Sequence, residues 1–238
     1  MVARNIVLLH GWGASREKLI PLGEELEKRG WKVYVPKIPG FIAPPPKVPW
    51  GLKEYTDFII KACNKFFKGK KYIIFGHSFG GRIALKASIF RPSLLGGIIL
   101  CSASGLSRGN LLKRYLFWTL AKLGKGLMLI PSVAKIWRIF LYKLSREHDY
   151  ERLSGVMRET FKKVLSEDLK PLVQEIEVPV LVFWGKKDKM TPVKDAYYIK
   201  SKKPHTKLVL FKNEGHQLPY NRPRTIVQEI DKWFTETY

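Results

Sequence analysis

Acidic residues are scarce in this chain of 238 residues: 20 Asp and Glu stand against 43 Lys and Arg, and the formal net charge is +23. Such an excess creates a positive field that attracts anionic surfaces or substrates. The basic residues are spread along the chain without a nucleic-acid recognition motif, so we expect no nucleic-acid partner. A solvated basic surface that reflects the habitat is the interpretation of the charge that we favour.

Cysteines and long apolar runs are also scarce. The two cysteines, Cys63 and Cys101, offer no disulfide framework, and neither has metal-ligand spacing, so we expect no metal site. No run approaches the roughly 18 uninterrupted apolar residues of a membrane-spanning helix. A strand-like run begins within five residues of the start and leaves no room for a signal peptide, which predicts a cytoplasmic protein.

Strand-like runs alternate with helix-like segments along most of the chain. This alternation is typical of an α/β fold, a parallel sheet with helices on both faces. The hydrophobic content of 45% is sufficient for a substantial core. We expect strands near residues 5–9, 31–35, 71–75, 96–101, 178–183 and 206–211, and helices near 16–29, 53–67, 79–91, 192–200 and 222–236.

Residues 76–80, with the sequence GHSFG, follow the apolar run 72–75 and place Ser78 at the apex of a strand–turn–helix unit. The pattern G-x-S-x-G is that of a nucleophile elbow, in which a strained turn exposes the serine hydroxyl above the sheet. The flanking glycines permit the turn because they carry no Cβ. Ser78 is therefore the predicted nucleophile.

A serine hydroxyl becomes a good nucleophile only when a base accepts its proton and an acid orients that base. His216 follows the strand-like run 207–211, and Asp188 follows the run 178–184. Both residues therefore lie just beyond the carboxyl end of a predicted strand, as Ser78 does. We predict that His216 is the base and Asp188 the orienting acid.

Other residues compete for these two roles. Asp195 is the alternative acid, but it falls within a predicted helix. His205 precedes a strand, at the wrong edge of the sheet, and His148 lies in a charged segment. Both histidines are expected to be surface residues.

Acyl transfer also requires backbone donors that stabilise negative charge on the carbonyl oxygen. Residues 10–13, with the sequence HGWG, follow the strand-like run 5–9 and provide a glycine-flanked loop. The N–H groups of Trp12 and of Phe79, the residue after the nucleophile, are the predicted oxyanion hole.

The motifs HGWG, GHSFGG, WGKKDKMTP and NEGH occur in this order along the chain. In these motifs the chain resembles the α/β-hydrolase fold superfamily, capped serine esterase type, over nearly its whole length. It is similar to carboxylesterases and, in HGWG, to pimeloyl-carrier methyl ester esterases. The resemblance implies the roles given above for Ser78, His216, Asp188, Trp12 and Phe79, and a six-stranded, mostly parallel sheet of spatial order 2-1-3-4-5-6. It also implies that the two other motif histidines, at positions 10 and 77, are structural.

The alternation of strands and helices breaks between residues 104 and 173, where the resemblance implies an inserted helical cap between two parts of the core, 1–103 and 174–238. Residues 105–146 contain nine Lys or Arg and no acidic residue, interleaved with aromatic and aliphatic residues. One interpretation is a basic cap that associates weakly with anionic membranes. The other, which we favour, is that the apolar residues line an acyl pocket while the lysines reach water.

We therefore expect a serine hydrolase that cleaves small-molecule carboxylic esters through an acyl-enzyme on Ser78, without a cofactor. A lactonase, a thioesterase and a carbon–carbon bond hydrolase would use the same triad, because selectivity depends on the shape of the cap. A non-catalytic ligand- or membrane-binding protein of this fold is the alternative from another class.

Overall fold

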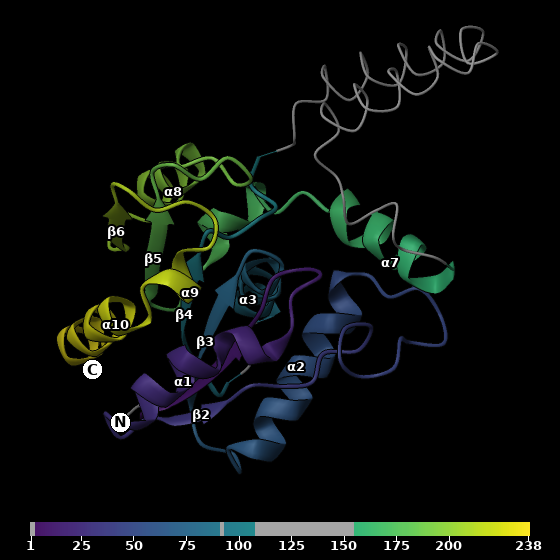
Figure 1. The fold of residues 1–238 in the computed structure, drawn as a ribbon, viewed down its shortest axis with the longest axis horizontal. Coiled ribbons are helices and arrows are strands. Elements are labelled where there is room, and N and C mark those ends of the chain that lie inside the picture. The colour runs from purple at the N-terminus through teal and green to yellow at the C-terminus, as the bar shows by residue number, and fades with distance from the viewer. Residues whose placement is uncertain (1–2, 91–92, 108–154) are drawn as a thin grey trace, which may run out of the picture.

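The computed structural model of the protein describes residues 3–90, 93–107 and 155–238 (Figure 1). Its strands are β1 (Asn5–Leu9), β2 (Lys32–Tyr34), β3 (Tyr72–His77), β4 (Leu95–Cys101), β5 (Val180–Gly185) and β6 (Lys207–Phe211). They form one sheet of order β2-β1-β3-β4-β5-β6 in which every neighbouring pair is parallel. The α/β fold class and the strand order expected from the sequence are confirmed.

Helices cover both faces of this sheet. The described helices, with three short 3-10 or α-helical turns, are η1 (Arg16–Leu19), α1 (Ile20–Glu27), α2 (Leu52–Phe66), α3 (Phe79–Phe90), α7 (Gly155–Ser166), η3 (Pro171–Glu175), α8 (Lys194–Lys202), α9 (Leu218–Asn221) and α10 (Pro223–Thr237). Buried residues of α2, α3 and α8 form one core cluster, and those of α1 and α10 form the other.

The strands contribute to both clusters because successive side chains of a strand point to opposite faces. In β3, Ile74 belongs to the cluster under α2 and α3, whereas Ile73 and Phe75 belong to the cluster under α1 and α10. Each of these three side chains is fully buried. Strands buried on both faces need nearly continuous apolar sequence, which is why their positions were evident from the sequence.

The strand order reverses beside β1, so that β1 lies between β2 and β3. In open α/β sheets, ligands bind at the carboxyl ends of the strands at such a reversal. The loops that follow β1, β3, β5 and β6 all emerge at this edge, and they carry the motifs singled out in the sequence.

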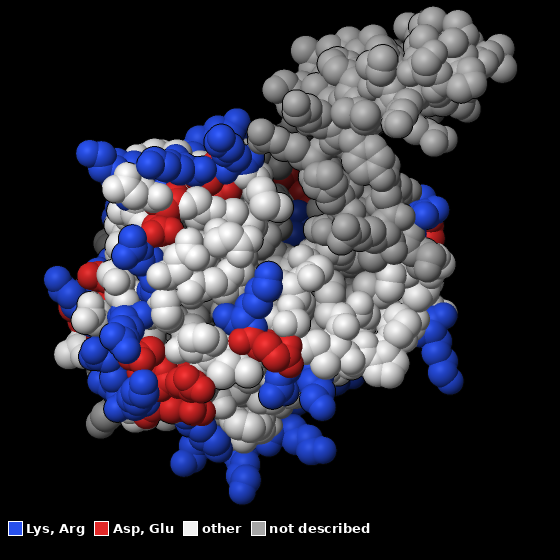
Figure 2. Space-filling model, in the orientation of Figure 1, with Lys and Arg blue, Asp and Glu red and all other residues white. Residues whose placement is uncertain are grey.

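Among the described residues between β4 and β5, none belongs to a strand, and α7 and η3 lie there. Most of the expected cap, including the basic segment from residue 108 onward and His148, lies outside the described residues. No helix in the described part of the chain is long and apolar enough to cross a membrane. On the face shown in Figure 2, Lys and Arg side chains are widely distributed, while Asp and Glu gather in small groups.

Asp231 on α10 is bonded to the residue before β1 and to the turn before β2. Its carboxylate accepts hydrogen bonds from Arg4 Nη1 at 2.9 Å, Arg29 Nη1 at 3.1 Å and Trp31 Nε1 at 2.7 Å. The Trp31 side chain is almost completely buried, so its N–H has little access to water if this acceptor is removed. A buried donor left without a partner costs more than the bond itself contributes.

We expect Asp231→Ala to lower the free energy of unfolding by about 2 kcal/mol. The substitution leaves the buried Trp31 N–H without an acceptor and removes the carboxylate that two guanidinium groups contact. Asp57→Ala is the control, since Asp57 pairs with Lys53 at 2.7 Å on an exposed helix surface. Such a pair contributes about 0.5 kcal/mol or less. Urea titrations followed by circular dichroism measure both changes, and equal losses would contradict the role given to Asp231.

Candidate active site

Ser78 stands at a strained turn between β3 and α3. Its backbone has a φ of 52°, in the left-handed region that non-glycine residues rarely adopt. Three backbone bonds hold this conformation: the Ser78 N–H donates to the Cys101 carbonyl at 3.1 Å, and the Ser78 carbonyl accepts from the N–H groups of Ser104 at 3.1 Å and Arg82 at 3.2 Å. The geometry is that of the predicted nucleophile elbow.

Glycines at two positions allow α3 to start this close to the sheet. A Cβ at Gly76 would overlap the carbonyl group of Gly80, and a Cβ at Gly80 would overlap the carbonyl group of Leu9. The Gly80 N–H donates to the His10 carbonyl at 3.1 Å, so the elbow is also bonded to the loop after β1.

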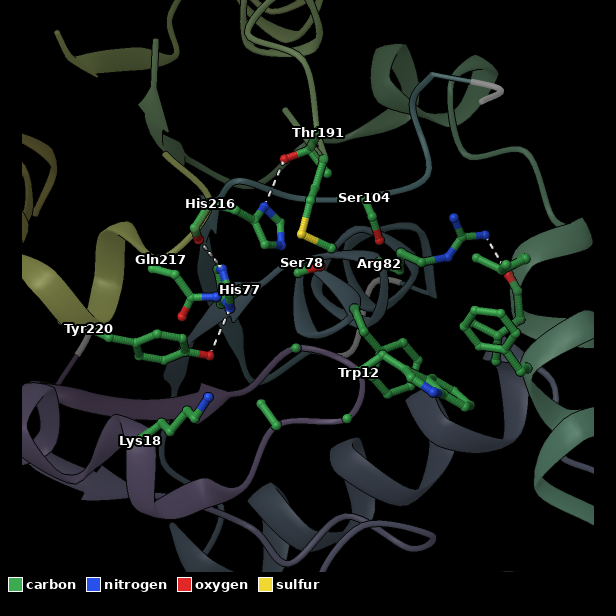
Figure 3. A pocket seen from close by; sticks show the side chains of 18 residues that line it. Trp12, Lys18, His77, Ser78, Arg82, Ser104, Thr191, His216, Gln217 and Tyr220 are labelled. Atoms are coloured by element: carbon green, nitrogen blue, oxygen red, sulfur yellow. Dashed lines mark hydrogen bonds between the residues drawn. The ribbon is translucent and has the colours of Figure 1, made fainter. Parts of the chain in front are cut away.

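A cavity of about 380 Å³ opens at this edge of the sheet (Figure 3). Ser78 and His216 line it together, with the candidate oxyanion residues Trp12 and Phe79. The remaining lining residues are Gly11, Gly13, Ala14, Lys18, His77, Arg82, Ser104, Phe161, Val164, Leu165, Met190, Thr191, Gln217 and Tyr220. The structure thus brings the predicted nucleophile, base and oxyanion residues to one cavity.

Asp188 and His216 are hydrogen-bonded. The Asp188 side chain is fully buried, and its Oδ2 lies 2.9 Å from Nδ1 of His216. The N–H groups of Met190 and Thr191 donate to Oδ1 at 2.8 and 2.9 Å, and the Thr191 hydroxyl donates to Oδ2 at 2.8 Å. Burial by itself raises the pKa of Asp188, but the hydrogen bond and charge of His216 and the Thr191 donors outweigh it and hold the pKa at about 2. The carboxylate is therefore ionised at neutral pH.

The residues that competed for these roles lie elsewhere. Asp195 is in α8, where it accepts a hydrogen bond from the Ser107 hydroxyl at 2.5 Å, and burial raises its pKa. His205 is exposed in the turn before β6. Asp188, and neither Asp195 nor another carboxylate of the described residues, contacts the His216 ring.

His77 holds the His216 backbone in place. Its Nε2 lies 2.8 Å from the carbonyl oxygen of His216, and its Nδ1 lies 3.0 Å from the hydroxyl of Tyr220 (Figure 3). A carbonyl can only accept, so Nε2 carries the proton and Nδ1 accepts from Tyr220. Burial, reinforced by the nearby His216, lowers the pKa of His77 to about 3, and the ring is neutral at pH 7. His77 is structural, as the resemblance implied.

Glu214 anchors the other side of the loop that carries His216. Its carboxylate accepts from Arg222 Nε at 2.6 Å and from Asn221 Nδ2 at 3.0 Å, both at the end of α9. Its carbonyl accepts from the N–H of Lys187, in the loop that carries Asp188. The loops after β5 and β6 are therefore bonded to each other as well as through the His216 ring.

The candidate oxyanion donors are the backbone N–H groups of Trp12 and Phe79. Within the described residues, neither N–H donates to a protein acceptor. The Trp12 ring packs edge-on against Phe79 with 5.1 Å between centroids and lies 4.8 Å from the ring of Phe161 on α7. These contacts fix the loop after β1 against the start of α3.

Three residues of the site were not identified from the sequence. Thr191 bonds Asp188, Tyr220 bonds His77, and Arg82 lines the cavity from α3. Thr191 lies within the WGKKDKMTP motif, so its position was a usable signal, whereas Tyr220 and Arg82 had none. No cluster of three or more His, Cys, Asp or Glu in the described part of the chain could hold a metal ion.

The neutral state of His77 predicts acid sensitivity. An unfolded histidine binds a proton below about pH 6.5, while the folded His77 does so only near pH 3, so the free energy of unfolding falls as the pH drops from 6.5 toward 3. Between pH 7 and pH 5 we expect this loss to be about 2 kcal/mol larger in the wild type than in His77→Gln. Urea denaturation at the two pH values measures it, and parallel profiles would contradict the burial argument. Gln is chosen because its amide can still donate to the His216 carbonyl. The contribution of His10 is common to both proteins and cancels in the comparison.

Comparisons with known proteins identify the family. The model of the alpha/beta hydrolase family matches residues 6–229. The 2-hydroxy-6-oxononadienedioate/2-hydroxy-6-oxononatrienedioate hydrolase of Cupriavidus pinatubonensis is 25% identical over 235 residues, which cover 90% of this chain and 81% of that protein. The pimeloyl-[acyl-carrier protein] methyl ester esterase of Neisseria meningitidis is 25% identical over 229 residues, with coverage of 90% and 86%.

Solved structures show the same fold. A thermophilic esterase from Thermogutta terrifontis superposes with a TM-score of 0.73 at 20% identity and covers 99% of this chain and 91% of its own. The family match extends over almost the whole chain, and the six-stranded sheet has the expected order. The protein belongs to the alpha/beta hydrolase family.

Proposed function

We propose that the protein is a serine hydrolase that cleaves carboxylic esters of small molecules. The observation that carries the proposal is the hydrogen bond between His216 and the buried carboxylate of Asp188, at the cavity that Ser78 lines. Ser78 is the nucleophile, His216 the general base and Asp188 the acid that orients the base. The esterase names of one curated relative and one solved structure support this choice of substrate class.

Ser78 Oγ attacks the ester carbonyl carbon while its proton passes to Nε2 of His216. Nδ1–H of His216 donates to Asp188 Oδ2, so the ionised carboxylate fixes the tautomer and stabilises the imidazolium that forms. The imidazolium then gives the proton to the departing alcohol, and an acyl-enzyme remains on Ser78. Water, deprotonated by His216, hydrolyses the acyl-enzyme and restores the serine.

Negative charge develops on the carbonyl oxygen in both steps. The N–H groups of Trp12 and Phe79 donate to this oxyanion. They need no reorganisation, because the ring packing and the elbow hold them before the substrate binds. Such preorganised donors stabilise the transition state more than the substrate, which is what increases the rate.

Ser78→Ala should lower kcat/KM for short p-nitrophenyl esters by at least about a thousandfold, because the acyl-enzyme cannot form. Ser201→Ala, which removes an exposed hydroxyl of α8, is the matched control and should retain wild-type rates. A fluorophosphonate probe should label the wild type and not Ser78→Ala. Equal rates for the Ser78 variant and the wild type would refute the nucleophile, and an unlabelled wild type would favour a non-catalytic binding protein.

Asp188→Asn and Asp195→Asn separate the two candidate acids. The first should reduce kcat by about a thousandfold or more, because Asn favours the wrong tautomer of His216. The second should stay within a few-fold of the wild type, because Asp195 bonds Ser107 and not the imidazole. Steady-state kinetics with a p-nitrophenyl ester measure both, and the reverse order of effects would assign the acid to Asp195.

Hydrolysis of a carbon–carbon bond by the same residues is the second candidate function. It is favoured by the relative whose name gives 2-hydroxy-6-oxononadienedioate as a substrate. Assay of such a vinylogous diketone beside the p-nitrophenyl esters discriminates between them, since the higher kcat/KM identifies the preferred bond.

A further inference from the structure

A buried arginine lies beside the candidate nucleophile. Arg82 is one helical turn after Ser78 on α3, lines the same cavity and is only 3% exposed. Figure 3 shows its side chain extending from the start of α3, past Ser104, toward α7. Burial lowers the pKa of Arg82 to about 10, against the opposing effect of Glu167 and Asp168, so the guanidinium is still charged at pH 7.

Only part of the guanidinium is bonded. Nη2 donates to the carbonyl oxygens of Val164 at 2.5 Å and Glu167 at 2.6 Å, at the end of α7. Arginine has five N–H groups. The one on Nε is buried and has no acceptor, and Nη1, which lies beside Gly105, donates to no acceptor in the described part of the chain. The α7 carbonyls therefore hold the group in one orientation and leave N–H donors unused.

The charge of this group is also poorly neutralised. Glu167 and Asp168 are the two carboxylates whose charges act on Arg82, but Glu167 is bonded to Lys86 at 2.5 Å and neither carboxylate hydrogen-bonds the guanidinium. Of the described residues that line the cavity, none is Asp or Glu, whereas two, Arg82 and Lys18, are basic. A buried charge is costly unless a partner of opposite sign is present, so an anion in this cavity would complete the site.

We propose that Arg82, together with the Ser104 hydroxyl, is a carboxylate-binding subsite, and that the substrates are esters whose acyl part ends in a carboxylate. The inference rests on the proposed function. His216 protonates the departing alcohol, so the alcohol lies on the His216 side of Ser78 and the acyl chain extends the other way. Ser104 and Arg82 lie on that other side (Figure 3). Half-esters of short dicarboxylic acids are the simplest probes, because they carry both an ester carbonyl for Ser78 and a carboxylate for Arg82.

The first experiment measures anion binding without catalysis. In the Ser78→Ala protein, glutarate should raise the melting temperature more than chloride does at equal ionic strength. Arg82→Met should abolish this excess, and Lys61→Met, which removes an exposed charge of α2 outside the cavity, should retain it. An equal effect of glutarate and chloride on Ser78→Ala overturns the subsite, whether or not the protein is a hydrolase.

The second experiment uses the active protein and two esters with the same leaving group and acyl length, the mono-p-nitrophenyl ester of glutaric acid and p-nitrophenyl valerate. After subtraction of the enzyme-free rates, kcat/KM should be about tenfold or more higher for the glutarate ester in the wild type and in Lys61→Met. Arg82→Met should lose this preference, mainly through a higher KM for the glutarate ester.

The outcomes separate the two proposals. Rapid hydrolysis of valerate with no preference for glutarate overturns the subsite and leaves the serine hydrolase intact. Hydrolysis of neither ester, with glutarate still stabilising Ser78→Ala, contradicts the proposed function and leaves the subsite. Loss of the bonds between α7 and the guanidinium can prevent Arg82→Met from folding. In that case the wild-type preference for the glutarate ester and the rise in melting temperature of Ser78→Ala with glutarate still test the subsite.

Discussion

The site depends on one constraint, the common direction of all six strands. In a parallel sheet every loop that follows a strand lies at the same edge, so residues that are far apart in the chain meet there. Trp12, Ser78, Asp188 and His216 follow β1, β3, β5 and β6, respectively, and three of them line one cavity. A slip in strand register or order would move these side chains relative to one another. The strands themselves tolerate little change, because side chains on both of their faces are buried.

The polar groups at this edge satisfy one another in a continuous chain of hydrogen bonds. Thr191 bonds Asp188, Asp188 bonds the His216 ring, the His216 carbonyl bonds His77, and His77 bonds Tyr220. Each member restricts the next, so the imidazole is held by its ring on one side and by its backbone on the other. Two buried members of this chain differ in charge: hydrogen bonds and the charge of His216 keep Asp188 ionised against the effect of burial, and burial keeps His77 neutral. Fully bonded polar networks of this kind fix a single arrangement of side chains.

Several of the few acidic residues connect segments that are distant in the chain. Asp231, Glu214 and Asp188 each accept two or more hydrogen bonds, and each joins segments that are distant in the chain or connects two loops of the site. None of the three carboxylates lines the cavity, where the described ionisable side chains other than histidine and tyrosine are basic. The excess of positive charge in the composition therefore has a local counterpart beside Ser78. Arg82 contributes to this positive charge and also bonds the end of α7. One side chain therefore both charges the cavity and holds part of its wall in place.

The order of the elements, the strand positions to within two residues and the strand order implied by the resemblance could be predicted from the sequence, as could the presence of the motif residues at one edge of the sheet. These features depend on local patterns: apolar strands, a glycine-flanked serine, and polar residues directly after strands. Contacts between distant residues could not be predicted in this way. The sequence favoured Asp188 over Asp195, but the contact of Asp188 with His216 depends on where β5 and β6 place their loops. The bond between His77 and the His216 carbonyl joins residues 139 positions apart. Likewise, only packing against α7 decides that the Arg82 guanidinium is buried and that its Nε–H has no acceptor among the described residues. Local sequence thus determined which groups are present at the edge of the sheet, and the tertiary structure decided which of them touch, because hydrogen bonds depend on distance in space and not on distance along the chain.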